Sequence, residues 1–208
     1  PQELVAALPP QAVITDVGSV KAPVLELWQG LHPRFVASHP MAGTAEAGVE
    51  AGQHGLFHGR PWVATPAAAT DPQALALVQG LAQAVGAHWL SCGAAEHDQA
   101  VALISHLPVL VGAALLQTAD RAGAAGAGDL AGLVRALASS GFADTSRVGG
   151  GNPELGTLMA RCNREALLVA LAVYRQQLEA LEQQVSQGDW QGLRQVLDRS
   201  QELRPQFL

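Results

Sequence analysis

Short apolar runs alternate with segments of helical periodicity in the first part of the chain. The apolar runs are typical of buried strands, and the expected strands are Ala12–Thr15, Phe35–Ser38, Trp62–Thr65 and His88–Ser91. Helical spacing marks three segments around them, which are Gln2–Leu8, Val20–Gln29 and Asp71–Val85. This alternation favours an α/β fold with a largely parallel sheet. The ends of the third helix are well marked, because Asp71 can cap it, Pro72 fits its first position and Gly86 ends it.

After Cys92 no segment has the pattern of a strand. The helices expected there are His97–Gln117, Leu130–Ser139, Asn152–Gln187 and Trp190–Leu203. We therefore divide the chain into an α/β part, residues 1–93, and an all-helical part, residues 94–208. At about 1.5 Å per residue, Asn152–Gln187 would form a helix roughly 50 Å long. Such a length suggests that its apolar side packs against a second subunit.

Composition narrows the class of protein. The 208 residues carry a formal net charge of −6, so we expect binding neither to nucleic acid nor to an anionic membrane. The most apolar run, Leu107–Leu116, is too short to span a bilayer. Cys92 and Cys162 lack the spacing of a disulfide framework or a zinc site, and no signal segment opens the sequence. We expect a cytoplasmic protein and assign no metal.

Polar side chains follow three of the expected strands: Asp16 and Ser19 the first, His39 the second, and Thr65-Pro66 the third. Carboxyl ends of parallel strands share one edge of a sheet, where open α/β sheets bind ligands. Histidine suits proton transfer there, because its pKa lies near neutrality. Ser19 could orient that ring or bind a substrate hydroxyl, and it could equally cap the following helix. Asp16 is best read as completing a turn.

A second set of polar residues lies in the helical part. His97 and Asp98 could simply be the polar start of a helix, and His106 is best explained as a hydrogen-bonded core histidine. Asp144 and Arg147 precede a triple glycine. An arginine on such a short loop could bind a carboxylate, or it could form a surface ion pair of little energetic value.

One motif of dinucleotide-binding sheets is absent. Such a sheet begins with a strand, Gly-x-Gly-x-x-Gly and a helix, and the sequence contains no such run. Either the chain lacks the first half of such a domain, or it does not bind a dinucleotide.

Four motifs in order resemble the prephenate/arogenate dehydrogenase family, and the run Val148–Thr157 looks most like its bacterial and cyanobacterial arogenate dehydrogenase branch. The four motifs begin at Asp16 (Asp-Val-Gly-Ser-Val-Lys), His39 (His-Pro-Met-Ala-Gly-Thr), His97 (His-Asp, with Ser-His-Leu-Pro from Ser105) and Gly141 (Gly-Phe-Ala-Asp-Thr-Ser-Arg). The resemblance covers nearly the whole chain. It implies the C-terminal portion of a Rossmann-like nucleotide-binding domain in residues 1–93. For residues 94–208 it implies a helical domain that binds substrate and forms a homodimer.

The resemblance also implies a reaction and roles. NAD or NADP would take a hydride from a cyclohexadienol, arogenate or prephenate, with loss of CO2, in tyrosine biosynthesis. His39 matches the catalytic histidine that accepts a hydrogen bond from the ring hydroxyl, and Ser19 assists it. The substrate would be held by Arg147, Asp144, Thr44 and His106. The cofactor would be contacted by Asp16, Ser19 and Pro66.

Two departures from the family pattern matter. Some prephenate-using members have a histidine after Ser-His-Leu-Pro, where this chain has Val109, and this favours arogenate. The missing glycine motif implies that most of the residues that bind the cofactor lie outside the chain. The choice between NAD and NADP therefore stays open. Two rival hypotheses are a metal-dependent hydrolase using His39, His97 and Asp98, and a non-catalytic helical dimerisation module.

Overall fold

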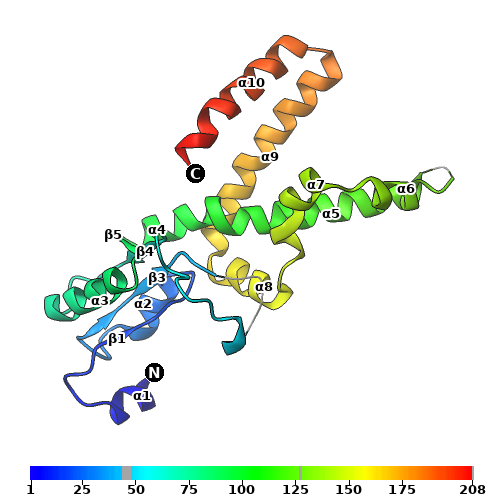
Figure 1. Cartoon of the computed structure of the whole chain (residues 1–208). Coiled ribbons are helices and arrows are strands. Elements are labelled where there is room, and N and C mark those ends of the chain that lie inside the picture. The colour runs from blue at the N-terminus through cyan, green and yellow to red at the C-terminus, as the bar shows by residue number, and fades with distance from the viewer. Residues whose placement is uncertain (44–47, 127, 208) are drawn as a thin grey trace. The chain divides into compact units, whose positions relative to one another are not determined.

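The computed structural model describes residues 1–43, 48–126 and 128–207. An α/β region comes first and a helical region follows it (Figure 1). The strands are β1 (Ile14–Thr15), β2 (Phe35–Val36), β3 (Ser38–Pro40), β4 (Pro61–Ala64) and β5 (His88–Ser91). The helices of this first region are α1 (Gln2–Ala7), α2 (Ala22–Trp28), the 3-10 turn η1 (Val49–Ala51) and α3 (Pro72–Ala84). The expected α/β class is confirmed.

The sheet is mixed rather than parallel throughout. β1 pairs in parallel with β2, and β4 in parallel with β5, but β3 pairs antiparallel with β4. β1 and β2 thus form a two-stranded sheet, and β3, β4 and β5 form a three-stranded one. Ala37, between β2 and β3, accepts a hydrogen bond from Thr65 N and extends the pairing with the β4 side by one residue. The expectation of a largely parallel sheet holds for the pairs β1–β2 and β4–β5 and fails for β3–β4, where the chain returns antiparallel after β3.

α3 covers one face of this sheet. Its small apolar residues Ala74 and Val78 pack with Val36 and Ala64, and Ala82 packs with Trp62 in a second cluster. As expected, Asp71 caps the helix by accepting hydrogen bonds from Gln73 N and Ala74 N, and Gly86 follows it with φ of +77°. The core of the α/β region therefore lies between α3 and the sheet.

The helical region begins with one continuous helical segment that contains a π-helical turn. Its elements are α4 (Ala94–Val101), the π-helix η2 (Ala102–His106) and α5 (Leu107–Ala125). This segment of 32 residues is apolar enough, by length and composition alone, to cross a membrane. That test is also passed by core helices, and His97, Asp98 and His106 on this segment are buried within the fold. The expected helix His97–Gln117, which contains the apolar run Leu107–Leu116, is thus confirmed as part of a helical segment that extends beyond it at both ends.

The remaining helices are α6 (Leu130–Leu137), α7 (Ser140–Ser146), the 3-10 turn η3 (Arg147–Gly150), α8 (Pro153–Cys162), α9 (Arg164–Gln187), α10 (Trp190–Leu203) and the 3-10 turn η4 (Arg204–Gln206). The expected single helix Asn152–Gln187 is wrong. Asn163, with φ of −120° and ψ of 35°, separates α8 from α9, so the argument from a 50 Å helix is lost. Two compact units are present, Pro1–Leu167 and Leu168–Leu208.

Candidate active site

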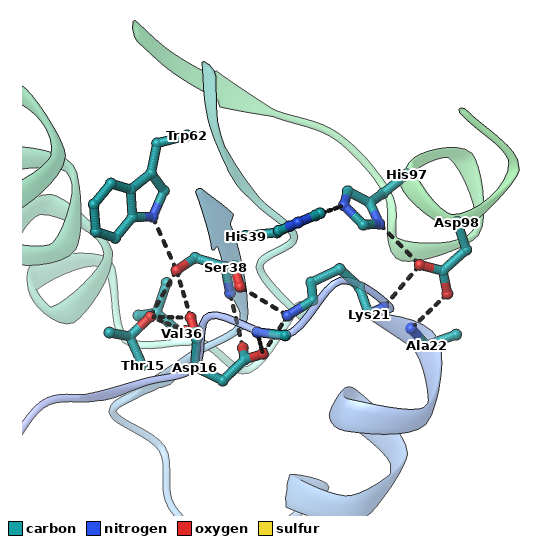
Figure 2. Close-up of polar contacts among 11 residues, drawn as sticks. Thr15, Asp16, Lys21, Ala22, Val36, Ser38, His39, Trp62, His97 and Asp98 are labelled. Carbon is teal, nitrogen blue, oxygen red and sulfur yellow. Dashed lines mark hydrogen bonds and ion pairs between the residues drawn. The ribbon is translucent and has the colours of Figure 1, made fainter. Parts of the chain in front are cut away.

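Three buried side chains form a hydrogen-bonded chain that starts at the sheet. His39 lies within β3, not after it, and its Nδ1 is 2.9 Å from His97 Nε2. His97 Nδ1 is 2.8 Å from Asp98 Oδ1 (Figure 2). The three side chains are 3–8% exposed. The sequence motifs at positions 39 and 97–98 therefore come together through the fold.

With both rings in the neutral form, the order of this chain determines which nitrogen of each ring carries the proton. An ionised carboxylate can only accept, so His97 Nδ1 donates to Asp98 and His97 Nε2 is left with its lone pair. His39 Nδ1 then donates to His97. As a result, His39 presents Nε2 as a hydrogen-bond acceptor.

The surroundings keep His39 in its neutral form. Burial lowers the pKa of His39 to about 4, and the nearby His97, Lys21 and His106 act in the same direction, against a smaller opposing effect of Asp98. A ring with this pKa is uncharged at neutral pH. It can accept a proton from a reacting group, although it is a weaker base than an unperturbed histidine.

Asp98 also holds the start of α2. Its Oδ1 accepts from Lys21 N at 2.7 Å and its Oδ2 from Ala22 N at 2.8 Å. Burial would raise the pKa of Asp98, but the hydrogen bonds from His97 and from these two amides outweigh burial and lower it. Of the two roles that the sequence left open for Ser19, the helix cap is wrong, because α2 begins at Ala22 and the carboxylate at its start is that of Asp98 in α4.

A buried polar cluster below His39 supports the site (Figure 2). Lys21, the only lysine in the sequence, is fully buried; its Nζ pairs with Asp16 Oδ2 and donates to Ser38 O at 2.7 Å. Burial lowers the pKa of Lys21, and the pairing with Asp16 opposes that shift. Ser38 Oγ accepts from Trp62 Nε1 at 3.0 Å. The sequence analysis missed this cluster, although a single lysine directly after a strand-end motif was a usable signal.

The carboxylate of Asp16 forms its hydrogen bonds and its ion pair with groups inside the protein. Its Oδ2 accepts from Gly18 N at 2.9 Å, which forms the turn favoured by the sequence, and its Oδ1 accepts from Ser38 N at 3.0 Å. With Lys21 on Oδ2 as well, its carboxylate organises the loop after β1. Ser19 lies half-buried on this loop, and its hydroxyl makes no hydrogen bond to another described residue.

His106 forms a second point of the same cluster. It is 2% exposed, and Asn163 Nδ2 lies 3.2 Å from its Nδ1. The same Asn163 nitrogen donates to the backbone oxygen of Asp98 at 2.7 Å. Thus the prediction of a hydrogen-bonded, buried His106 is confirmed.

Pro66 lies on a different part of the sheet from the one expected. Because β4 runs antiparallel to β3, its carboxyl end, followed by Thr65-Pro66, lies beside Ala37 and Ser38 at the beginning of β3, and not at the end of β3 as a parallel sheet would require. The topological reason for a cofactor contact at Pro66 is therefore lost. Thr44 lies outside the described residues.

Asp144 and Arg147 are on helical turns rather than on a loop. Asp144 belongs to α7 and Arg147 begins η3; both are exposed, and neither forms an ion pair within the described part of the chain. η3 packs against α5, where Gly149 is so close that an added Cβ would lie 2.1 Å from Ala113 N. This contact sets where Arg147 lies along α5.

Two models of protein families match the chain, one in each of its two parts. Residues 2–91 match the model described as "Prephenate dehydrogenase, nucleotide-binding domain", and residues 93–199 match "Prephenate dehydrogenase, dimerization domain". The chain belongs to the prephenate dehydrogenase family. The motifs that carried the resemblance in the sequence are thus supported over both parts of the chain.

Individual proteins that are similar to this chain are prephenate or arogenate dehydrogenases. The chain is 30% identical over 186 residues to prephenate dehydrogenase of Bacillus subtilis, which covers 88% of this chain and 49% of that protein. The crystal structure of Synechocystis arogenate dehydrogenase matches with a TM-score of 0.84 at 44% identity, covering 100% of this chain and 73% of that one. Prephenate dehydrogenase from A. aeolicus, in complex with hydroxyphenyl propionate and NAD+, matches with a TM-score of 0.89 at 28% identity, covering 100% and 71%. The chain spans about half the length of the B. subtilis relative.

The geometry does not favour the rival metal-dependent hydrolase. Two nitrogens bound to one zinc ion at about 2.0–2.1 Å in tetrahedral geometry lie roughly 3.3 Å apart, whereas those of His39 and His97 are in direct hydrogen-bond contact at 2.9 Å. Among residues 1–43, 48–126 and 128–207, no three His, Cys, Asp or Glu side chains gather around a common point that could hold a metal.

Proposed function

We propose that this chain carries the catalytic histidine of a cytoplasmic NAD(P)-dependent dehydrogenase that oxidatively decarboxylates arogenate, or alternatively prephenate, in tyrosine biosynthesis. The observation that carries the proposal is the buried, neutral His39, whose Nδ1 is occupied by His97 and whose Nε2 is an acceptor. An acceptor of this kind matches a substrate hydroxyl that becomes more acidic as hydride leaves its carbon. Family membership and the likeness to both named structures support the same reaction.

In the proposed reaction, NAD(P)+, held in part by the loop that carries Ser19, would supply the hydride acceptor for the ring carbon that bears the hydroxyl. His39 accepts the hydroxyl proton as the carbonyl develops. The ring carboxylate leaves as CO2, its bonding electron pair makes the ring aromatic, and the proton returns from His39 to the phenolic oxygen. His97 and Asp98 hold the His39 ring in its accepting tautomer and offset the positive charge that it briefly carries.

The residues of this chain fit one part of a dinucleotide site. The loop from Asp16 to Lys21 follows a strand of an open α/β sheet, at the place where nucleotides bind in such folds, and Ser19 Oγ there has no described partner. The carboxylate of Asp16 is filled by internal hydrogen bonds and an ion pair. We therefore assign Ser19, and not Asp16, to cofactor or substrate contact.

We further propose that Arg147 holds the ring carboxylate, with Asp144 next to it in α7. Gly112 of α5 faces η3, and it lies six positions after His106 on a continuous helical segment, which corresponds to about 9 Å along the axis. The turn that carries the exposed Arg147 therefore packs on the same helical segment as His106, which supports a role for its guanidinium in binding the small molecule. Val109 supports arogenate over prephenate, because it offers no polar group at that position.

The test is His39→Ala in the whole protein. We expect kcat to fall by about 10²–10⁴-fold, because a positioned general base contributes that much, while the dissociation constant of NAD(P)+ stays unchanged. Steady-state kinetics with arogenate and with prephenate, each with NAD+ and with NADP+, also gives substrate and cofactor preference.

The matched control is His88→Ala, since His88 is exposed at the start of β5 and should tolerate replacement. Full turnover in His39→Ala would refute the proposed mechanism. Wild-type protein that turns over neither substrate with either cofactor would refute the proposed function and favour the non-catalytic dimerisation module.

A further inference from the structure

Asn163 occupies the junction between α8 and α9 and is 6% exposed. Its Nδ2 makes two contacts, 2.7 Å to Asp98 O and 3.2 Å to His106 Nδ1. Side-chain amides are often ambiguous, because their oxygen and nitrogen look alike. Here the backbone oxygen of Asp98 can only accept, so the amide nitrogen must face it.

This orientation determines the state of His106. One hydrogen of Asn163 Nδ2 goes to Asp98 O, and the other points to His106 Nδ1, which must therefore accept with its lone pair. The neutral ring then carries its proton on Nε2. Burial lowers the pKa of His106, which keeps the ring neutral at neutral pH.

The proton on Nε2 has no acceptor within the described part of the chain, although the atom is fully buried. A buried donor without a partner is costly, and in native proteins it calls for a specific explanation. His106 also ends the π-helix η2, and such turns are frequent at functional sites. An acceptor supplied by a bound small molecule would satisfy this atom.

We propose that Asn163 is a positioning residue that fixes His106 as a hydrogen-bond donor toward an acceptor oxygen of a bound small molecule. The inference rests on the proposed function. The oxygen would belong either to a carboxylate of the substrate or to the carboxamide of the nicotinamide. The site then offers two imidazoles of opposite polarity, with His39 accepting and His106 donating.

Asp98 fixes the tautomers of both His39 and His106. Its carboxylate fixes His97 and through it His39, while its backbone oxygen fixes Asn163 and through it His106. A molecule with a hydroxyl donor and a carbonyl-type acceptor would match both rings, whereas one with two donors would match only one. This discriminates among ligands without any net charge at either histidine.

The first test observes the tautomers directly, by ¹⁵N-edited NMR of histidine-labelled whole protein. We expect Nδ1 protonated in His39 and Nε2 protonated in His106. In Asn163→Asp a carboxylate faces His106, and the proton should move to Nδ1. The control is Asn152→Ala, which removes the cap at the other end of α8 and should leave His106 unchanged. A wild-type His106 protonated on Nδ1, or no change in Asn163→Asp, would overturn the inference.

The second test identifies the ligand that accepts the hydrogen bond from His106 Nε2. Glutamine at 106 can place an amide near the position of Nε2, whereas asparagine reaches only that of Nδ1. We expect His106→Gln to stay within a few-fold of wild type, and His106→Asn to weaken one ligand by about 10- to 100-fold. A rise in the KM of the cyclohexadienol alone identifies the substrate, and a rise in that of NAD(P)+ alone identifies the cofactor. Unchanged KM values for both in His106→Asn would overturn the inference.

These measurements separate the inference from the function on which it rests. The tautomers are read without turnover, so an inactive wild-type protein with the expected tautomers would refute the dehydrogenase but not the role of Asn163. Conversely, an active enzyme in which His106 is protonated on Nδ1 would refute only the role of Asn163.

Discussion

At the scale of single residues, the low pKa of His39 makes the stability of the protein depend on pH. The pKa of this ring is about 4 in the folded chain, whereas the ordinary pKa of histidine, which applies to the unfolded chain, is 6.5. Between these values the unfolded chain binds a proton that the folded chain does not. The free energy of unfolding is therefore greatest above about pH 6.5 and falls as the pH drops toward 4.

Urea denaturation at several pH values between about 7.5 and 4.5 measures this dependence. His39→Gln should make the slope shallower, because it removes one of the two histidines whose pKa burial lowers. The exposed His88 again offers a matched replacement, and His88→Gln should keep the wild-type slope. A stability that rises on acidification would contradict the neutral, buried state of His39.

Sequence motifs identified His39, His97, Asp98 and His106, but they could not assign their partners. His97 was open to interpretation as the polar start of a helix, because its sequence neighbours do not reveal that β3 lies opposite. Lys21 and Ser38 escaped notice for the same reason. Their importance comes from burial in the folded chain, which the local pattern does not show for Ser38 and signals for Lys21 only through its being the single lysine.

At the scale of elements, the approach of η3 to α5 sets the place of Arg147. Gly149→Ala would put a methyl group 2.1 Å from Ala113 N, so η3 must move away from α5. We expect a loss of stability of about 1–3 kcal/mol and a higher KM for the substrate, with the affinity for NAD(P)+ unchanged. Thermal denaturation and steady-state kinetics measure the two effects.

Gly150→Ala is the matched control for that experiment. A Cβ at Gly150 would meet Leu116 Cδ1 at 3.8 Å, an ordinary contact, so both stability and KM should stay close to wild type. If Gly149→Ala had the KM of wild type, the link between this packing contact and the carboxylate site would be disproved.

Helix and strand positions were largely predictable, whereas strand direction and helix breaks were not. Asp71, Pro72 and Gly86 mark their helix locally, and the structure has it almost as expected. β4 was found as an apolar run, but periodicity is the same for a parallel and an antiparallel strand. Asn163 interrupts a helical pattern because its side chain is held by Asp98 and His106, which are more than fifty positions away.

At the scale of the whole molecule, an apolar groove in the helical region is the surface that we propose to test as the interface of the expected homodimer. It has a volume of about 500 Å³ and lies among α5, α6 and α7, lined mainly by apolar residues that include Leu116, Val134 and Leu137. Leu137 is 71% exposed, although burying such a side chain is favourable. The matching family domain is described as a dimerization domain.

Leu137→Asp should therefore raise the dissociation constant of the dimer on the order of 10- to 100-fold, because it replaces an exposed leucine, which the expected interface would bury, with a charge. Light scattering over a range of protein concentrations measures it. Leu4→Asp changes an exposed leucine of α1, which is 49% exposed, and should leave the dimer intact. Equal dissociation constants for the two variants would place the interface elsewhere.

The burial of Lys21 has a practical consequence. Since this is the single lysine of the chain and its side chain is 0% exposed, an acylating reagent can reach that amine only after the loop following β1 has opened. The rate of acylation at Lys21, followed by peptide mass spectrometry, would thus report local unfolding in the native protein. Substrate and cofactor should slow the labelling if they bind over that loop.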